Sequence, residues 1–320
     1  MSEPKSLQEA VVYFSNPDNC LKYLVARRWP KGVVCPTCAS DKVSFNASRR
    51  IWQCSSHHAK RQFSVKVGTI FEDSPISLDK WLAAMWMVAN CKNGVSSWEI
   101  HRSLGVTQKS AWFMLHRLRL ALQVKSTVRL GGSGKIVEVD ETFIGGLSRN
   151  MHAEKRARII TAHGPKDKAI VVGILERGKK IHTQVVSNTK QRTLQGCVRE
   201  HVIPGADVVS DASPSYVGLH KDYEHQVIDH AVAYVHGNVH TNGLENYWSL
   251  LKRGIKGTYV SVEPFHLFRY LDEQAFRFNN RATKENPMND ADRFDLAVSL
   301  IIGKRLTYAE VTGKVGETIN

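Results

Sequence analysis

The stretch IVEVDETFIGG, residues 136–146, decides how the rest of the chain is interpreted. Its β-branched residues predict a strand, and its glycine pair predicts where that strand ends. Carboxylates are costly to bury in an apolar strand. The strand therefore has either a solvated face or a site that binds a metal ion, and the later acids Asp211 and Glu245 favour the metal site.

Three acids in this strand differ in the direction we expect them to face. Because side chains alternate between the two faces of a strand, Glu138 and Asp140 share one face and Glu141 points to the other. Asp140 is the strongest candidate for a metal ligand, with Glu138 as a supporting neighbour. The alternative is that Asp140 caps a helix or faces solvent.

The sequence that follows predicts a mixed α/β domain. Strands are expected at residues 169–175, 180–186, 207–211 and 226–228, and helices at 189–202 and 242–254. Gly178 marks the turn between the second and third strands. Three meandering strands, a helix, a strand and further helices are the order of a ribonuclease-H-like α/β fold.

Two later acids fall where such a fold would use them. Asp211 ends a strand and Glu245 lies on the helix that follows, so both could meet Asp140 in space. Carboxylate oxygens prefer Mg²⁺ or Mn²⁺ to zinc. We therefore predict a pair of these ions, which suits phosphodiester chemistry because one activates the attacking oxygen and the other stabilises the leaving oxygen.

Each of these acids also has a simpler interpretation. Asp211 could cap a helix, and Glu245 could be a surface acid that Asn242, one turn earlier, replaces or assists. Lys252 is seven residues after Glu245 and shares its helix face, with Trp248 between them. The lysine either holds a DNA phosphate beside the metal ions or is a solvated charge.

Two histidines precede this helix. His236 and His240 either form a separate metal pair or are polar residues of a loop near DNA, and we favour the loop.

The N-terminal region, residues 1–70, contains a cysteine pattern typical of a zinc ribbon. Cys35 and Cys38 form one knuckle, and Cys54 with His57 forms a second, with fifteen residues between the inner cysteines. Four such ligands fit a closed, structural zinc site. His57 has the knuckle spacing, although the adjacent His58 is an alternative. The three other cysteines are scattered, which indicates a reducing compartment.

Charge favours a polyanionic partner. The formal net charge is +14, so we expect nucleic acid. The basic and aromatic tracts at residues 49–53 and 60–63 either contact a DNA backbone or form a solvated ribbon face. No run of about 18 apolar residues exists, so we expect no membrane span. The N-terminus lacks an apolar signal core, so we expect a cytoplasmic protein and not an exported one.

Residues 71–130 predict a helix-turn-helix region that binds DNA. An amphipathic helix at 78–88 precedes two helices joined by a turn at Gly105, with Ser96 or Ser97 capping the first and Thr107 the second. Residues 123–134 contain three glycines and predict a linker.

The second helix of this pair would present three side chains to the major groove. These candidates for DNA binding are Gln108, Lys109 and Arg117. The alternative is an ordinary helical hairpin.

The runs VEVDETFIGG, VVSDAS and HTNGLENYWSLLKRGIKGTY resemble bacterial insertion-sequence transposases of the DDE class. The most similar group has an N-terminal zinc ribbon and a lysine after the third acid. The likeness includes CPTC, RQFSVKVGTIFEDSPISLDKW and LFRYLDEQAFRFNNR, so it covers roughly residues 15–285. It implies an enzyme that cleaves the terminal inverted repeats of its own element, frees 3′ ends and joins them to target DNA.

The resemblance also implies roles for particular residues. Asp140, Asp211 and Glu245 match the catalytic triad, and Lys252 matches the lysine that follows it. Some relatives replace the glutamate, so Glu245 is the least secure of the three.

The remaining matches concern zinc and DNA. Three zinc ligands match Cys35, Cys38 and Cys54, whereas His57 stands where the family usually has a cysteine. Arg253, next to the matched lysine, is a further candidate for DNA binding.

These inferences divide the chain into four parts. We expect N-terminal helices and a zinc ribbon in 1–70, a helix-turn-helix in 71–130, a ribonuclease-H-like catalytic domain in 135–285 and a C-terminal extension in 286–320. The partners would be double-stranded element ends and target DNA, with the protein acting as a homo-oligomer on DNA. The rival functions are a regulator that binds DNA without catalysis and a structure-specific nuclease.

Overall fold

The computed structural model describes residues 3–123, 128–146, 152–159, 167–228 and 240–314. The chain forms two compact units. Unit 1 combines Met1–Gln123 with Asn280–Asn320, and unit 2 is Val124–Asn279. The residues that we treated as a C-terminal extension from 286 therefore group with the N-terminal half of the chain.

Unit 2 is built on a five-stranded sheet with the order β6-β5-β4-β7-β8. The strands are β4 (Ile136–Ile144), β5 (Ala169–Glu176), β6 (Ile181–Val186), β7 (Asp207–Asp211) and β8 (Glu224–Ile228). The β5 strand is antiparallel to β4 and β6, while β7 runs parallel to β4 and β8. All five strands expected from the sequence are present.

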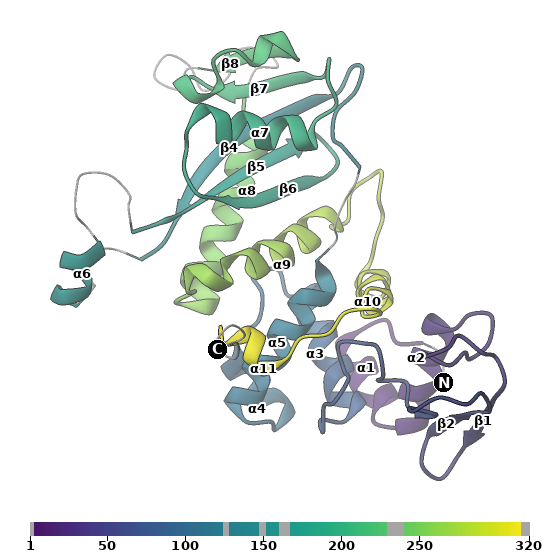
Figure 1. Ribbon diagram of the computed structural model, residues 1–320. Helices are drawn as coiled ribbons and strands as arrows, with labels where there is room; N and C mark the ends of the chain where they lie inside the picture. The colour runs from purple at the N-terminus through teal and green to yellow at the C-terminus, as the bar shows by residue number, and fades with distance from the viewer. Residues whose placement is uncertain (1–2, 124–127, 147–151, 160–166, 229–239, 315–320) are drawn as a thin grey trace. The chain divides into compact units, whose positions relative to one another are not determined.

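Helices cover both faces of this sheet (Figure 1). On one face, α7 (Gln191–His201) packs over the side chains of Val137 and Val139 from β4. On the other face, α8 (Asn242–Arg253) and α9 (Leu267–Asn279) pack over alternate residues of β5. The strand alternation that we inferred from the sequence therefore separates two apolar cores, and α8 lies on the Asp140 side.

Several short elements complete the described part of unit 2. They are α6 (Ala153–Ile159), the 3₁₀ turns η2 (Pro214–Tyr216), η3 (Leu219–Lys221) and η5 (Pro264–His266), and the π-helix η4 (Gly254–Tyr259) that extends α8.

The glycine-rich segment before β4 is part of unit 2 rather than a free linker. The Leu130 N–H donates to the His201 carbonyl at 2.7 Å. Gly131 has φ +87°, and a Cβ there would lie 2.7 Å from Cβ of Ala206. The expected linker is thus corrected for residues 128–134, because this segment is hydrogen-bonded to unit 2 and packs so closely at Gly131 that no side chain would fit there. Residues 124–127 of that segment lie outside the described residues.

Unit 1 begins with two helices and a small three-stranded sheet. The elements are α1 (Leu7–Phe14), α2 (Pro17–Arg28), β1 (Val43–Asn46), β2 (Ile51–Cys54) and β3 (Gln62–Phe63). Asn16 caps α2 and Pro17 occupies its first turn, which is a favourable position for proline because it needs no N–H there. The rings of Trp52 and Phe63 stack on each other, and Trp29 packs edge-on against both.

The helix pair predicted in unit 1 is present with its predicted caps. After α3 (Leu78–Asn90) come α4 (Ser97–Leu104) and α5 (Gln108–Leu122). Ser96 forms a capping box on α4, Thr107 accepts from the Ser110 N–H on α5, and Gly105 ends α4 with φ +60°. The C-terminal segment adds α10 (Asp290–Ser299) and α11 (Tyr308–Val311).

Arg117 does not face outward, and its assignment as a DNA-binding residue is wrong. It is 5% exposed and lies on the same face of α5 as the buried Met114 and Ala121. Its guanidinium donates to the carbonyls of Ile70, Glu72 and Leu306 at 2.7–3.0 Å. These acceptors come from segments far apart in the sequence, so α5 alone could not reveal that the arginine binds them.

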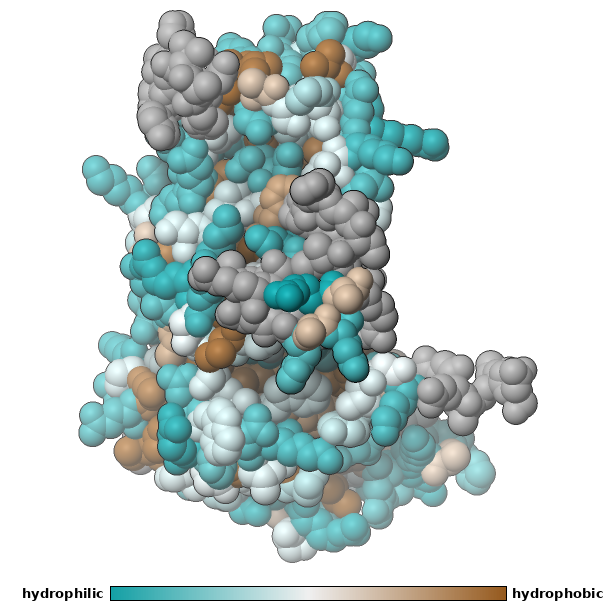
Figure 2. Space-filling view, turned by 90° about the vertical axis from the view of Figure 1, so that its left-hand side faces the viewer, coloured by the Kyte–Doolittle hydropathy of each residue, from teal (hydrophilic) through white to brown (hydrophobic). Residues whose placement is uncertain are grey.

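On the surface shown in Figure 2, hydrophilic residues predominate and hydrophobic residues occur in small groups. No helix in the described ranges combines the length and apolarity that crossing a bilayer requires.

We predict that Arg117→Ala destabilises unit 1. The substitution leaves three carbonyls without their donor, so the free energy of unfolding should fall by about 2–4 kcal/mol. Thermal unfolding followed by circular dichroism measures the change. Lys109→Ala is the matched control, because Lys109 is exposed on the same helix and loses only its contact with the Tyr308 ring, so the melting temperature should fall far less. Equal melting temperatures for the two variants would contradict the structural role of Arg117.

Candidate functional site

Asp140 lies on the face of β4 that packs against α8. The Trp248 indole Nε1–H donates to Asp140 Oδ2 at 2.8 Å, and the Glu141 backbone N–H donates to Asp140 Oδ1 at 2.8 Å. Both oxygens of the carboxylate are therefore held in place. Each still has a lone pair that can accept another bond or bind a cation.

Asp211 lies beside Asp140 because their strands are parallel. The register pairs Val139 with Ser210, so Asp140 and Asp211 are the next residues on neighbouring strands. Asp211 Oδ1 accepts the Ser213 N–H at 3.2 Å, which turns the chain away from the strand end.

Glu245 occupies the first turn of α8 and is exposed. The negative charge of Glu245 acts on the Asp140 carboxylate. Burial raises the pKa of Asp140 to about 6, with further increases from the Asp211 and Glu245 charges, while the Trp248 hydrogen bond opposes the rise. The charges of the three predicted acids therefore interact, although their oxygens do not all lie within 4.8 Å of one another, and we call them the electrostatic group. A cation bound among them would relieve the repulsion.

The N-terminus of α8 is anchored to the sheet by Glu138. This carboxylate is 1% exposed, accepts the Leu244 N–H at 3.0 Å and accepts from Arg177 Nε at 2.7 Å. Arg177 also donates to the His240 carbonyl at 2.6 Å. The supporting role that we expected of Glu138 is therefore the placement of the helix that carries Glu245.

Two glycines allow α8 to approach the sheet. A Cβ on Gly243 would lie 2.5 Å from Leu175 Cδ2 and 2.8 Å from Glu138 Oε2. A Cβ on Gly173 would lie 2.6 Å from Trp248 Cζ2. Gly173 pairs with Asp140 across β4 and β5, so the residue opposite the acid leaves room for the indole that binds it.

Glu141 points to the opposite face, as the alternation predicted. The Tyr216 hydroxyl donates to its Oε2 at 2.5 Å, and Tyr216 is 1% exposed. Burial raises the pKa of Glu141, and the charges of Asp211 and Asp140 raise it further. This bond ties β4 to the turn that follows Asp211.

The other residues predicted to bind DNA lie at the end of α8 and at the start of α5. Lys252 is partly buried near the end of α8, and the neighbouring Arg253 is exposed. Gln108 donates to Ser97 Oγ at 2.9 Å, which joins α5 to α4. Lys109 lies over the Tyr308 ring, with its Nζ 5.0 Å from the centroid.

The structure describes no metal pair made by His236 and His240, the two histidines near the start of α8. His240 contacts Arg177 through Nδ1 at 3.1 Å, whereas His236 lies outside the described residues. Asn242 is exposed as the first residue of α8.

The cysteine cluster of unit 1 has the composition and spacing of a zinc site. Cys35, Cys38, Cys54 and His58 place one ligand atom each within 4.8 Å of one another, and no other such group occurs among the described residues. Cys38 Sγ is 3.6 Å from Cys54 Sγ, close to the separation of about 3.8 Å expected of two thiolates on tetrahedral zinc. These donors fit Zn²⁺.

His58, and not His57, completes this cluster. Its Nε2 lies 3.4 Å from Cys35 Sγ, while His57 is exposed. The expectation of His57 is therefore corrected: the chain turns after Cys54 so that the second histidine points inward.

The Cys35 thiol is prepared for zinc by its hydrogen bonds. Burial raises the pKa of Cys35, but the N–H groups of Cys38 and Thr37 lower it, for a net value of about 6, which favours the thiolate that binds zinc.

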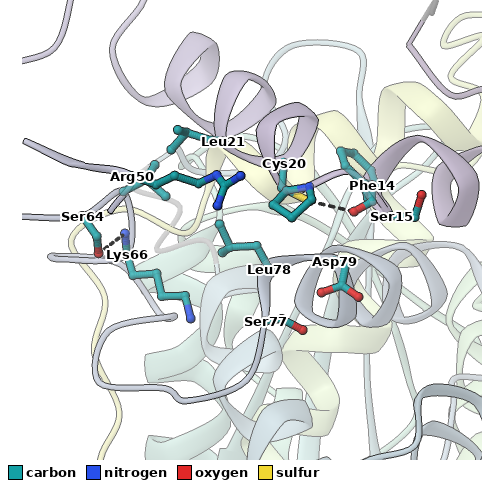
Figure 3. A pocket seen from close by; sticks show the side chains of 12 residues that line it. Phe14, Ser15, Cys20, Leu21, Arg50, Ser64, Lys66, Ser77, Leu78 and Asp79 are labelled. Atoms are coloured by element: carbon teal, nitrogen blue, oxygen red, sulfur yellow. Dashed lines mark hydrogen bonds between the residues drawn. The ribbon is translucent and has the colours of Figure 1, made fainter. Parts of the chain in front are cut away.

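Unit 1 also has a pocket of about 410 Å³ beside α1, α2 and the start of α3 (Figure 3). Its two cations are already engaged. Arg50 donates to Asp18 at 2.7 Å, and Lys66 Nζ donates to the carbonyls of Ser74 and Ile76 at 3.0 and 2.7 Å. Cys20 Sγ donates to the Phe14 carbonyl at 3.0 Å. The pocket therefore contains polar groups that stabilise unit 1 itself.

Sequence reasoning missed several residues that build the carboxylate site. Gly173 had a signal, because a glycine inside an apolar strand often marks a close approach of another element. Arg177 and Tyr216 had none, since each acts through a partner remote in sequence. Trp248 was noticed only as lying between Glu245 and Lys252.

We predict that His58→Ala releases zinc and that His57→Ala does not. The His57 variant should retain about one zinc per chain after dialysis against a weak chelator, as the wild type should. The His58 variant should lose most of its zinc. Elemental analysis of the dialysed proteins measures the difference, and the reverse pattern would restore His57 as the ligand.

We also predict that Gly173→Ala disturbs the contact between α8 and the sheet. The added methyl would overlap Trp248, which should lower the free energy of unfolding by about 1–3 kcal/mol. Gly196→Ala is the matched control, because Gly196 is exposed on α7 with no atom near its Cβ position. That change should stabilise the helix by about 0.5–1 kcal/mol. Denaturant titration of both variants separates the two outcomes.

Comparison with known proteins agrees with this arrangement. Residues 129–279 match the ISXO2-like transposase domain, and residues 15–59 match the transposase zinc-ribbon domain. A relative described as an uncharacterized protein in transposable element ISH50, from Halobacterium salinarum, is 26% identical over 239 residues, which cover 71% of this chain and 79% of that protein. The two domain matches contain the carboxylate group and the Cys₃His cluster respectively. The chain belongs to the insertion-sequence transposases of the DDE class that carry an N-terminal zinc ribbon.

Proposed function

We propose that this transposase binds the terminal inverted repeats of its own element, cleaves them to free 3′-hydroxyl ends and joins those ends to target DNA. The observation that carries the proposal is the electrostatic group of Asp140, Asp211 and Glu245, assembled from two neighbouring strands and a helix. A buried carboxylate whose pKa is raised by burial and by neighbouring carboxylates, as that of Asp140 is, is typical of sites that bind cations.

The topology of unit 2 supports a ribonuclease-H-like core. Three antiparallel strands, a helix and a further strand follow one another in the order that we expected of this fold, and β7 and β8 extend the sheet in parallel on the β4 side. In this sheet β7 ends at Asp211, beside Asp140 in the middle of β4.

The donor set fits Mg²⁺ or Mn²⁺, because all three groups offer hard oxygen ligands. Asp140, Asp211 and Glu245 would hold the two ions. When bound, the ions activate the attacking oxygen and stabilise the leaving oxygen of the phosphodiester.

Protein groups would orient the DNA at this site. Lys252 lies two helical turns after Glu245, where its ammonium would hold a phosphate beside the carboxylates. Arg253 is exposed next to it and would contact the backbone. These cations offset the repulsion between DNA and the acids, so they should affect substrate affinity more than metal affinity.

Unit 1 would recognise the element ends. The capped helices α4 and α5 suit a helix-turn-helix, in which Lys109 near the start of α5 would contact DNA while Gln108 joins the two helices. The Cys₃His cluster would hold a structural zinc ion. With a net charge of +14, the protein would act on the nucleoid, as an oligomer that brings two element ends together.

We predict that Asp140→Asn, Asp211→Asn and Glu245→Gln each abolish Mg²⁺-dependent cleavage of labelled inverted repeats. Loss of a metal ligand removes several kcal/mol of transition-state stabilisation, so the rate should fall by about a thousandfold or more. Binding of the ends, measured by mobility shift, should persist.

Asp207→Asn is the matched control. Asp207 begins the strand that Asp211 ends, so it belongs to the opposite edge of the sheet and its neutralisation should leave cleavage unchanged. Cleavage without joining would identify a structure-specific nuclease. Binding without cleavage by the wild type would identify a DNA-binding regulator, and either result would overturn the proposal.

A further inference from the structure

We propose that Trp248 is a positioning residue whose indole N–H fixes the Asp140 carboxylate relative to Glu245, so that both acids can bind the same pair of divalent ions. This inference rests on the proposed two-ion chemistry. Trp248 would not touch the substrate or the ions.

The helix α8 carries the tryptophan and two other side chains of the proposed site. Glu245, Trp248 and Lys252 are separated by three and four residues, so they lie on one face of the helix. The indole nitrogen is a donor only, and it binds Asp140 Oδ2 at 2.8 Å. The bond therefore joins the strand that carries the first acid to the helix that carries the third.

The indole ring has little freedom to leave this position. Trp248 is 5% exposed and packs in the core formed by β5, α8 and α9. Its ring occupies the space left by the absent side chain of Gly173, and the Tyr247 ring packs edge-on against it with centroids 5.3 Å apart. A donor held this firmly can impose its geometry on the carboxylate.

The consequence for Asp140 is a single orientation of its carboxylate. Trp248 binds Oδ2 and the Glu141 N–H binds Oδ1, so rotation about the last side-chain bond would break both contacts. Residues that orient metal ligands commonly change metal affinity or activity by about 10–100-fold when they are lost. Trp248 has the position of such a residue, although it contributes no ligand atom.

A direct test compares Trp248→Phe with Tyr247→Phe in the full-length, zinc-loaded protein. Both variants keep a buried aromatic ring on α8 and lose one polar atom, but only the first loses the donor to Asp140. Free Mn²⁺ is followed by electron paramagnetic resonance in the absence of DNA. Asp140→Asn serves to identify the part of the binding that belongs to this site.

We expect Trp248→Phe to weaken Mn²⁺ binding about tenfold and to raise the Mg²⁺ concentration needed for half-maximal cleavage by a similar factor. Binding of element ends should be unchanged. Tyr247→Phe should leave both metal values as in the wild type, whatever its effect on the melting temperature. A purely structural role for Trp248 would lower the melting temperature without this selective change in metal affinity.

A second replacement guards against misfolding of the phenylalanine variant. Site-specific incorporation of benzothienylalanine at position 248 keeps the bicyclic ring and removes the N–H. Wild-type Mn²⁺ affinity in this protein would overturn the inference and leave the proposed function intact. Wild-type Mn²⁺ binding that Asp140→Asn does not reduce would instead overturn the proposed function itself.

Discussion

The arrangement of unit 2 depends on the close approach of α8 to the sheet, which is possible only because two positions lack a side chain. A methyl group at residue 173 would overlap Trp248, and one at residue 243 would overlap Leu175 and Glu138. With these positions open, the helix carries Glu245, Trp248 and Lys252 to the Asp140 side of β4. The two glycines thus set the distance between α8 and the sheet, and the contacts of the site form across that distance.

A buried charge fixes where the helix begins. Glu138 is costly to bury alone, but Arg177 and the Leu244 N–H satisfy it, and the partial positive charge of the helix N-terminus adds to the stabilisation. A shift of α8 along its axis would break the contact with the Leu244 N–H. The three acids of β4 therefore act differently: Glu138 anchors the helix, Asp140 enters the proposed metal site, and Glu141 binds Tyr216.

Much of this organisation could be predicted from the sequence because its signals are local. Apolar runs defined the strands, alternation separated Asp140 from Glu141, and cap residues marked the starts of α4 and α5.

The errors arose where distant segments decide the outcome. Arg117 has the charge of a DNA-binding residue, yet its acceptors belong to residues 70, 72 and 306. Likewise, knuckle spacing alone could not choose between His57 and His58, because the turn after Cys54 decides which ring points inward.

The division of unit 1 between two segments has a consequence for synthesis of the protein. Lys304 donates to the carbonyls of Ala121 and Gln123 at 2.7 Å, and the Ile70 N–H donates to the Ile301 carbonyl at 3.2 Å. On the ribosome, residues 1–123 emerge first and wait for these partners until all of unit 2 has been translated. A chain that terminates early therefore cannot complete the unit proposed to recognise DNA. Translation itself ensures that any complete unit 1 is attached to a complete unit 2.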